Sequence, residues 1–388
     1  MLSKFSIFDQ KNIMSEVLYQ INPDRTVPWN ELPNLPIKEE LHETIEILKK
    51  LGDAKAALAK LQGRSVVIPN QGLLINTISL QEAKISSEIE NIFTTDDELY
   101  KEYSDRNSQS RGASKEVLRY REALWSGFNY LKDGGSFSQE YFTKVFQEIK
   151  QTSDKVRPPF IETTIKQGGT GSTSGKVIYT PPRGKGIIEE KLENLYNFIN
   201  NDEQYRIDYL LKMSIAHYQF EAIHPFRDGN GRTGRVFNIH YLTAKNLLDY
   251  PVLFLSRYIL DHKNDYYSCL QGVSQRGRWK EWILFMLRAV EQTSTLTFNK
   301  INEIVSAKDS ILNHVKSEGR FLNPENLIEF IFTEPFTKVN HLVNSGIYAE
   351  KTARKYLNDL CEMQVLEKKV LEGKHYYLNI ELYRILSD

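Results

Sequence analysis

The sequence predicts a mainly α-helical protein, and three observations support this. Apolar residues recur at spacings of three and four over long stretches, which is the period of an amphipathic helix. Residues 161–182 interrupt this pattern with β-type residues that are typical of a hairpin. The end of the chain then shows three short helical patterns followed by a second hairpin. We therefore expect three parts: an N-terminal helical region (1–110), a helical core (111–293) and a winged-helix-like domain (294–388).

Composition narrows the class of protein before any motif is considered. The 388 residues include 50 basic and 50 acidic side chains, so no overall charge favours a polyanion or a membrane surface as partner. The two cysteines, Cys269 and Cys361, lie far apart in helical patterns, which favours buried thiols in a reducing compartment over a disulfide framework. No apolar run is long enough to span a bilayer and no signal-type segment begins the chain. We expect a cytoplasmic protein.

The N-terminal region is predicted to contain an arm, two helices and a loop. Prolines punctuate residues 1–36, which favours an extended arm over the surface. Residues 38–61 repeat apolar positions at helical spacing, and Gly63 follows as a stop signal. A second helical pattern covers 73–92. Residues 94–114 are polar, and we expect a loop there.

The first half of the core predicts two helices and the hairpin. Helices are expected over 117–131 and 138–150, and Ser138 is a suitable N-cap for the second. The hairpin strands are 161–165 and 176–180, separated by a glycine-rich tip. Gly175-Lys176 is not a phosphate-binding P-loop, because a valine follows where that loop needs Ser or Thr.

A twelve-residue stretch carries most of the chemistry. It runs from His224 to Arg235 and reads His-Pro-Phe-Arg-Asp-Gly-Asn-Gly-Arg-Thr-Gly-Arg. A helix over 205–223 precedes it and ends at Pro225, since proline cannot continue a helix. A second helix is expected over 232–248. The stretch is therefore a glycine-rich loop between two helices.

This loop has the parts of a phosphate site. Residues 229–231 lead into a helix N-terminus, where unpaired N–H groups and the helix dipole favour an anion. Arg232 and Arg235 lie three apart and can lean over the same anion. Asp228 is a hard oxygen ligand that suits Mg²⁺ bridging phosphates. His224 is placed as a general base toward an attacking hydroxyl.

Two other interpretations of the loop are weaker. Residues 229–234 match the dinucleotide-binding glycine pattern, but that pattern needs a preceding strand and a helix is predicted here. A simple turn with solvated arginines would explain a lone glycine pair. It does not explain a base, an acid, an anion nest and two spaced arginines together.

The stretch resembles the motif of the Fic (Fido) domain family, His-x-Phe-x-Asp/Glu-Gly-Asn-Gly-Arg-x-x-Arg, and meets every fixed position. The resemblance implies transfer of AMP from ATP to a protein hydroxyl. It further implies that His224 is the base, that Asp228 holds Mg²⁺, and that Asn230 with the loop amides stabilises the α-phosphate. Arg232 would contact the β-phosphate region and Arg235 the γ-phosphate, completing a nucleotide site with the loop glycines Gly229, Gly231 and Gly234.

The glycine at position 231 bears on the type of reaction. The related Doc-type kinases carry a lysine at the matching position and bind the nucleotide in the opposite direction. The resemblance therefore implies nucleotidyl transfer, with phosphoryl transfer the less favoured chemistry. The choice of AMP over another nucleotide follows the majority of the family.

The resemblance extends to an inhibitory helix, expected over about 78–92. One class of Fic proteins carries Ser/Thr-x-x-x-Glu-Gly/Asn before the core, and Ser86, Glu90 and Asn91 fit that pattern. A Glu90 carboxylate that reaches Arg235 would occupy the space and the positive field meant for the γ-phosphate. The alternative is a surface face in which Ser86 and Glu90 lie one helical turn apart. The resemblance favours inhibition.

Two further regions of the core gain an expected role. By resemblance the hairpin over 161–182 is the flap that docks a target segment as an added strand, beside the histidine. Two helical patterns follow the motif between 258 and 290. Tyr266 and Tyr267 within them are expected to border the adenine pocket.

The C-terminal part predicts a winged helix after a polar helical link over 295–317. Its helices and strands are expected over 323–332, 338–344, 349–363, 365–370 and 375–378. The third helix carries charges of both signs, whereas a surface that tracks DNA phosphates is more basic. We therefore place protein docking or dimerisation slightly ahead of DNA binding.

Two functional classes remain in view. The first is an autoinhibited protein adenylyltransferase that uses ATP and Mg²⁺ and modifies a Ser, Thr or Tyr hydroxyl of a target protein or of itself. The second is a DNA-binding or protein-docking regulator in which the Fic core is a nucleotide-responsive switch. Removal of AMP from a modified protein, with Glu90 activating water, is a further alternative in the same class of fold.

Overall fold

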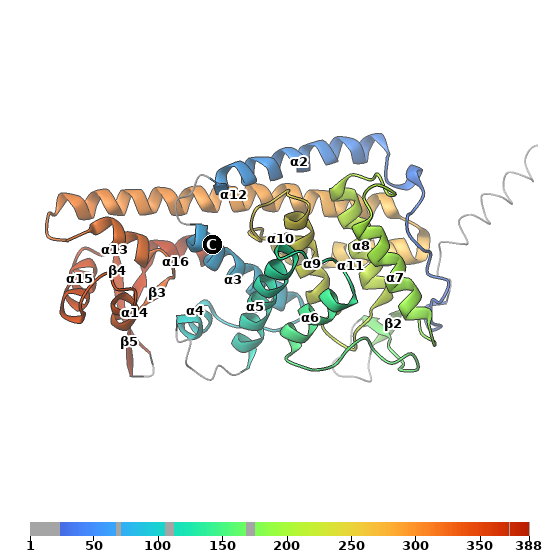
Figure 1. Cartoon of the computed structure of the whole chain (residues 1–388), viewed down its shortest axis with the longest axis horizontal. Helices are drawn as coiled ribbons and strands as arrows, with labels where there is room; N and C mark the ends of the chain where they lie inside the picture. Colours follow the sequence, from blue (N-terminus) through green and yellow to red (C-terminus); the bar gives the residue numbers. More distant parts are fainter. Residues whose placement is uncertain (1–23, 67–70, 105–111, 168–174, 372, 388) are drawn as a thin grey trace, which may run out of the picture.

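The molecule is mainly helical and elongated, and its long axis follows two helices that lie side by side (Figure 1). The computed structural model describes residues 24–66, 71–104, 112–167, 175–371 and 373–387. Helix α2 (Ile45–Val66) packs along α12 (Trp279–Ser317), whose 39 residues correspond to a length of about 58 Å. Helix α12 runs from the core at one end of the molecule to the C-terminal elements at the other, and it contacts α13 and α16 there.

Two buried helices form the centre of the core. Every residue of α8 (Tyr209–Ile223) except Tyr209 and Glu221 is buried, so this helix is covered on all sides. Helix α9 (Asn230–Ala244) packs against it. The surrounding helices are α5 (Ala113–Lys132), α6 (Gln139–Lys150), α7 (Ile187–Asn200), α10 (Leu255–Asp261) and α11 (Lys263–Arg276). The loop between α8 and α9 is thus held at both ends by buried helices.

The predicted N-terminal helices exist with shifted ends. Helix α2 starts at Ile45 instead of residue 38, after a short 3₁₀ turn (Glu39–Leu41), and Gly63 does not end it. The described part of the arm is held by the core, since the backbone N–H of Trp29 donates to the carbonyl oxygen of Thr180 at 3.0 Å. Residues 1–23 of that arm lie outside the described residues.

The loop predicted over 94–114 is wrong for its first half. Helix α3 (Gln71–Ile89) is followed directly by α4 (Asp96–Ser104). Helix α4 buries one face, Leu99, Tyr100 and Tyr103, and its many acidic residues hid that face in the sequence. The Tyr383 hydroxyl near the C-terminus donates to Asp97 at 2.8 Å, so α4 is bound to the end of the chain.

The hairpin is shorter than predicted. Strands β1 (Ile165–Gln167) and β2 (Lys176–Tyr179) pair antiparallel, with Ile165 opposite Tyr179. Residues 161–164 are not part of the strand, and the tip over 168–174 lies outside the described residues. The Tyr179 hydroxyl donates to the carbonyl oxygen of Ala222 at 2.8 Å, which ties the hairpin to α8 just before the loop that starts at His224.

The C-terminal end contains the predicted helices and hairpin together with two elements that the sequence did not indicate. Its elements are α13 (Pro324–Ile331), β3 (Phe336–Thr337), α14 (Val339–Asn344), α15 (Glu350–Glu362), β4 (Leu366–Leu371), β5 (Lys374–Asn379) and α16 (Ile380–Ser387). Strand β3 and helix α16 are the additions, and the sheet order is β3-β5-β4. The link predicted over 295–317 is the second half of α12. The winged-helix assignment stays a prediction.

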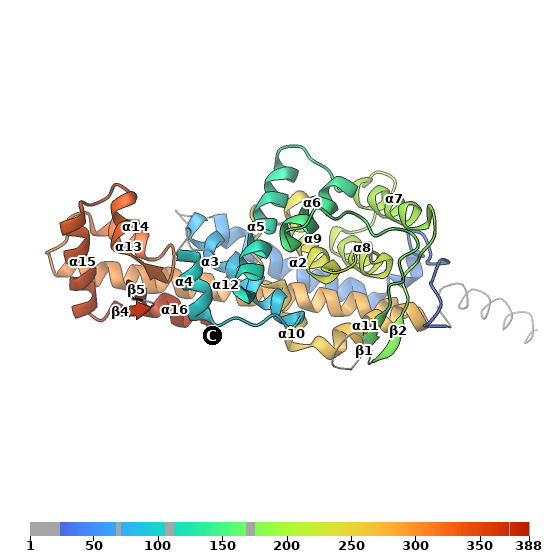
Figure 2. The same ribbon diagram turned by 90° about the horizontal axis from the view of Figure 1, so that it is seen from below.

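Figure 2 shows α3 and α4 between the core and the C-terminal elements. Helix α3 packs on α5 and α10, and it also touches α9 and α16. Cys269 and Cys361 are both free thiols. Within the described parts of the chain, no helix is long and apolar enough to cross a membrane.

Candidate active site

His224 lies at the C-terminal end of α8, in a left-handed backbone conformation with φ of 50°. Such a conformation is costly for a residue other than glycine and needs support from its surroundings. The support comes from Arg157, whose Nε donates to the His224 carbonyl oxygen at 2.9 Å while its backbone N–H donates to that of Pro225 at 2.8 Å. Arg157 is 2% exposed. It fixes the direction in which the chain leaves the helix.

The His224 imidazole is kept neutral. Burial lowers the pKa of His224 to about 4, and the nearby positive charge of Arg157 adds to this effect. Its Nδ1 is enclosed by protein, and the neighbouring Glu221 backbone raises the pKa against these two effects without cancelling them. The ring lines a cavity, which favours Nε2 as the nitrogen that meets a substrate. A neutral imidazole with one accessible nitrogen can accept a proton from a hydroxyl.

The loop after His224 is anchored by an aromatic stack and an amide. The Phe226 ring stacks on Phe146 with centroids 4.0 Å apart. The Asn230 side chain accepts from the Phe226 N–H at 2.9 Å and donates to its carbonyl oxygen at 2.8 Å. Asn230 therefore closes the loop on itself. The α-phosphate contact expected for this residue stays a prediction, and its backbone N–H at the start of α9 is one group suited to it.

Asp228 is an exposed carboxylate at the mouth of the loop. Its Oδ2 accepts from Lys150 Nζ at 2.7 Å, and its Oδ1 accepts from the Gly229 N–H at 2.7 Å. Desolvation raises the pKa of Asp228, but the hydrogen bond and charge of Lys150 outweigh it, so the pKa lies below its ordinary value. The group is ionised at neutral pH.

This carboxylate fits a phosphate-bound Mg²⁺. The described residues contain no cluster of three or more His, Cys, Asp or Glu side chains that could hold a metal by themselves. Mg²⁺ at phosphate sites commonly takes one or two carboxylates and completes its shell with phosphate oxygens and water. A single exposed Asp228 beside a helix N-terminus meets that requirement, provided Lys150 releases it.

Both motif arginines are buried and each has a carboxylate partner. The Arg232 Nη1 donates to Glu116 of α5 at 2.8 Å. The Arg235 Nη2 donates to Glu90 at 2.7 Å and to the Ser86 carbonyl oxygen at 3.0 Å, while its Nε donates to the Ser86 hydroxyl at 2.8 Å. Burial lowers the pKa of Arg235, but the Glu90 charge outweighs it and the net shift is upward. The contact predicted between Glu90 and Arg235 is present.

The end of α3 explains how Glu90 reaches the motif. The helix stops at Ile89, and Asn91 takes a left-handed conformation with φ of 62°, so Glu90 lies in the turn and points out of the helix. Gly231 leaves room for its carboxylate. A Cβ at position 231 would lie 2.5 Å from Glu90 Oε1. A larger residue at this place would therefore force the Glu90 carboxylate to shift.

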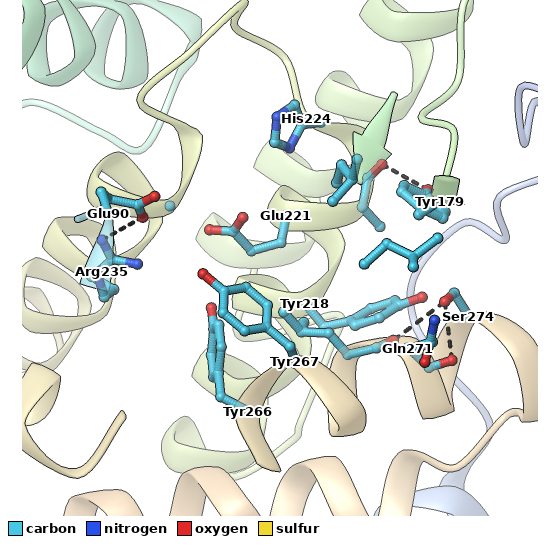
Figure 3. A pocket seen from close by; sticks show the side chains of 15 residues that line it. Glu90, Tyr179, Tyr218, Glu221, His224, Arg235, Tyr266, Tyr267, Gln271 and Ser274 are labelled. Atoms are coloured by element: carbon cyan, nitrogen blue, oxygen red, sulfur yellow. Dashed lines mark hydrogen bonds and ion pairs between the residues drawn. The ribbon is translucent and has the colours of Figure 1, made fainter. Parts of the chain in front are cut away.

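These residues surround a cavity of about 200 Å³. It brings together Glu90, His224, Gly231 and Arg235 with Ile165 and Ile178 of the hairpin. Tyr266 and Tyr267 of α11 line it too (Figure 3), and the adenine contact expected for them stays a prediction. Tyr266 is buried and its hydroxyl lies 2.9 Å from His217 Nε2, whereas Tyr267 is 37% exposed. Among the described residues, a histidine, an arginine, two tyrosines and the hairpin therefore line the same cavity.

The sequence analysis did not predict several side chains that contact the motif or line the cavity. Arg157, Lys150 and Glu116 contact the motif from segments 67 or more residues away, and no spacing marks such contacts. Glu221 also lines the cavity, and its Oε1 is buried without a hydrogen-bond partner. Its signal was available: it is the one acidic residue in an otherwise apolar and neutral-polar stretch directly before His224.

The fold and this site define a class of protein: a helical domain in which a glycine-rich loop joins two buried helices and begins with a histidine. Residues 137–242 match the Fic/DOC family model, and residues 48–129 match that of the Fic/DOC family N-terminal region. Residues 308–382 match the C-terminal domain of SoFic-like protein adenylyltransferases. The chain is therefore a Fic-domain protein with Fic-type N-terminal and SoFic-like C-terminal regions.

Similar proteins carry adenylyltransferase names. The protein adenylyltransferase fic-1 of Caenorhabditis elegans is 26% identical over 161 residues, which are 42% of this chain and 29% of that protein. The protein adenylyltransferase Fic of Aedes aegypti is 28% identical over 30% of this chain and 22% of its own. A probable protein adenylyltransferase of Aquifex aeolicus is 25% identical over 51% of this chain and 62% of its own. In each case the match spans less than two thirds of the relative.

Solved structures share the fold. A Fic family protein from Desulfovibrio desulfuricans has a TM-score of 0.52 at 18% identity, covering 89% of this chain and 98% of its own. Fic-1 from C. elegans has a TM-score of 0.51 at 16% identity, covering 66% and 73%. At these identities the likeness concerns the fold.

Proposed function

We propose that this protein is an autoinhibited protein adenylyltransferase. It transfers AMP from ATP to a Ser, Thr or Tyr hydroxyl of a target protein or of itself, and Glu90 blocks the site through Arg235. The observation that carries the proposal is the shared cavity, which is lined by His224, by Gly231 and Arg235 of α9, and by the hairpin. The names of the relatives support the same activity.

The nucleotide is held by the start of α9. The first N–H groups of this helix have no partner within it and carry the positive end of the helix dipole, so they suit phosphate oxygens. Arg232 and Arg235 extend this positive field along the phosphate chain, toward the β- and γ-phosphates. Asp228 would hold Mg²⁺, which supplies charge neutralisation for the departing pyrophosphate. Tyr266 and Tyr267 form the wall for the base.

The transfer step needs one base. The target hydroxyl oxygen attacks the α-phosphorus, its proton passes to Nε2 of His224, and the bond to the β-phosphate oxygen breaks to release pyrophosphate. Because the pKa of His224 is lowered to about 4, the imidazole is neutral at physiological pH and ready to accept this proton. The hairpin presents the hydroxyl: β2 lines the cavity with Ile178, and a target segment paired to the hairpin would lie beside His224.

Inhibition follows from geometry and charge. The Glu90 carboxylate occupies the position above Gly231 and takes one Arg235 nitrogen, both of which a γ-phosphate would need. An anionic phosphate cannot share that space with a carboxylate, so ATP must displace Glu90 to bind in the productive orientation.

The test compares full-length parent, Glu90→Gly and the double variant Glu90→Gly/His224→Ala with ATP and Mg²⁺. ATP labelled at the α-phosphate should label protein strongly in Glu90→Gly, weakly in the parent and not in the double variant. ATP labelled at the γ-phosphate should label none of them, which separates AMP transfer from phosphoryl transfer. Equal α-label in the parent and Glu90→Gly would refute the inhibition. α-Label that persists without His224 would refute the mechanism, and label from neither ATP would favour a nucleotide-responsive switch.

A further inference from the structure

Glu221 lies in the wall of the proposed nucleotide site, and one of its two carboxyl oxygens is buried without a hydrogen-bond partner. It lies on α8 three residues before His224, so the two side chains are about one helical turn apart. In Figure 3 its side chain is drawn between His224 and the two tyrosines. Its Oε1 is buried without a hydrogen bond, although Arg235 is close, because the hydrogen bonds of Arg235 go to Ser86 and Glu90.

The carboxyl is held in place by α9. A Cβ at position 234 would lie 2.5 Å from Glu221 Oε1, so Gly234 lets the carboxyl press against the helix backbone beside Arg235. The other side of Glu221 faces the cavity. A buried polar atom that lacks a partner costs free energy and is rare in native structures, unless a ligand or water supplies the partner.

Burial also keeps Glu221 protonated near neutral pH. It raises the pKa of Glu221 to about 8; the Arg235 charge lowers this value and the Glu90 charge raises it. A neutral carboxyl can donate a hydrogen bond, whereas an ionised one would repel a triphosphate. Because a bound nucleotide brings several negative charges close to this group, it favours the protonated form further.

We propose that Glu221 contacts the nucleotide as a neutral carboxyl group that donates its O–H to a nucleotide oxygen, so that nucleotide binding at this site takes up a proton. The inference rests on the proposed function, because it takes the cavity to be the nucleotide site. It assigns a binding role to a residue outside the twelve-residue motif. It also makes the affinity for ATP depend on pH.

The direction of that dependence follows from linkage. Below the pKa of Glu221 in the free protein, the group is protonated in both states and affinity does not change with pH. Above it, a proton must be taken up on binding, so affinity falls by up to about tenfold per pH unit until the pKa of the bound state is reached. The affinity is therefore lost as pH rises from neutral toward alkaline values.

The other groups that face Glu221 do not titrate in this window. On α8, burial lowers the pKa values of His217 and His224 to about 3 and about 4. On α11, burial raises the pKa of Tyr267 to about 12 and that of Tyr266 further. Arg235 on α9 stays charged, since the Glu90 contribution outweighs its desolvation. Glu90 is removed from the variants used for the test, and because its charge raises the pKa of Glu221, the fall in affinity begins at a lower pH in those variants.

The experiment is calorimetric titration of ATP with Mg²⁺ into the full-length Glu90→Gly protein, between about pH 7 and pH 9.5, in two buffers of different ionisation heat. The phosphates of ATP lose their last proton near pH 6 and do not interfere. We expect proton uptake approaching one per site at the alkaline end and an affinity that falls by more than tenfold over the range. In Glu90→Gly/Glu221→Gln the amide still donates a hydrogen bond, and we expect binding with neither proton uptake nor pH dependence.

A second buried carboxyl provides the matched control. Glu82 on α3 is 1% exposed, and its pKa is raised by burial to about 7. Its oxygens are occupied by the Ser256 N–H and hydroxyl, and it does not line the cavity. Glu82→Gln in the Glu90→Gly background should keep the pH dependence. Thermal melting of each variant establishes that it is folded.

The outcomes separate the inference from the function on which it rests. The inference is wrong, and the proposed function is unaffected, if ATP binds with the same pH dependence in Glu221→Gln as in the protein that keeps Glu221. The same holds if the pH dependence disappears only in Glu82→Gln. If no folded variant binds ATP at any pH, the proposed function falls and the inference falls with it.

Discussion

Two arginines of the motif each pair with a carboxylate in a similar way, yet only the Glu90–Arg235 pair lines the cavity. Arg232 is 2% exposed and bound to Glu116 at 2.8 Å, and Arg235 is 1% exposed and bound to Glu90 at 2.7 Å. The partner carboxylates are similarly accessible, at 34% and 33%. Distance, burial and charge therefore do not distinguish the pairs.

The difference lies in position. Glu90 lines the cavity and occupies the space above Gly231, whereas Glu116 approaches Arg232 from α5 and is not among the residues that line it. Arg235 is also held by Ser86 through two hydrogen bonds, while the Nε of Arg232 is buried without a partner. We therefore expect an ion pair to inhibit only when its carboxylate occupies the space that the nucleotide needs. Pairing with a motif arginine is not sufficient.

The largest expected effect tests that distinction with matched neutral variants. Glu90→Gln should raise AMP transfer roughly thirtyfold, because it weakens a competing charged contact worth about 2 kcal/mol. Glu116→Gln should change the rate by less than about threefold, since a partly exposed pair outside the cavity contributes little. Initial rates of self-modification at one subsaturating ATP concentration measure both. Similar increases in the two variants would show that pairing, and not position, decides.

The same comparison shows what a sequence can reveal. The Glu90–Arg235 contact was predictable because both residues belong to local patterns, a six-residue motif and a twelve-residue motif, that a family resemblance links. Glu116 belongs to no pattern. Its contact with Arg232 arises only when α5 packs beside α9, 116 residues later in the chain.

The helices show the same difference between features that local patterns predict and features that depend on tertiary contacts. Helices with a clear apolar period, such as α5 and α6, were predicted to within a few residues, including the Ser138 cap that accepts from the Tyr141 N–H. Helix α4 was missed because its acidic residues dominate a short segment whose buried face is made by tertiary contacts. Glu221 was missed for a different reason: it stands out as the one acidic residue of α8, but its place in the wall of the cavity became clear only from the structure.

The next effect is a coupling between Gly231 and Glu90. An alanine in a helix is ordinarily more stable than a glycine by about 0.5–1 kcal/mol, but a Cβ at position 231 would collide with the Glu90 carboxylate at 2.5 Å. Gly231→Ala should therefore lower the melting temperature of the parent and raise that of Glu90→Gly. The four proteins form a double-mutant cycle with an expected coupling of about 1–2 kcal/mol. Additive shifts would mean that the carboxylate does not rest on this glycine in solution.

The smallest expected effect concerns the hydrogen bonds between Ser86 of α3 and Arg235. The Ser86 hydroxyl accepts from Arg235 Nε at 2.8 Å, and the Ser86 carbonyl oxygen would remain bound to Nη2 in Ser86→Ala. Losing one hydrogen bond to a charged group, about 1 kcal/mol, should raise the basal rate of AMP transfer about fivefold.

Ser87→Ala is the matched control for that variant. Ser87 is as fully buried as Ser86, but its hydroxyl donates to the Ala83 carbonyl oxygen within α3 and does not contact Arg235. Both substitutions remove one buried hydroxyl from the same helix, so they should destabilise the fold similarly. Only Ser86→Ala should raise the rate, and combining it with Glu90→Gly should add nothing, because the helix then has no blocking carboxylate to position. A rise in Ser87→Ala of the same size would trace the effect to loosening of α3 as a whole and remove Ser86 from the inhibitory contact.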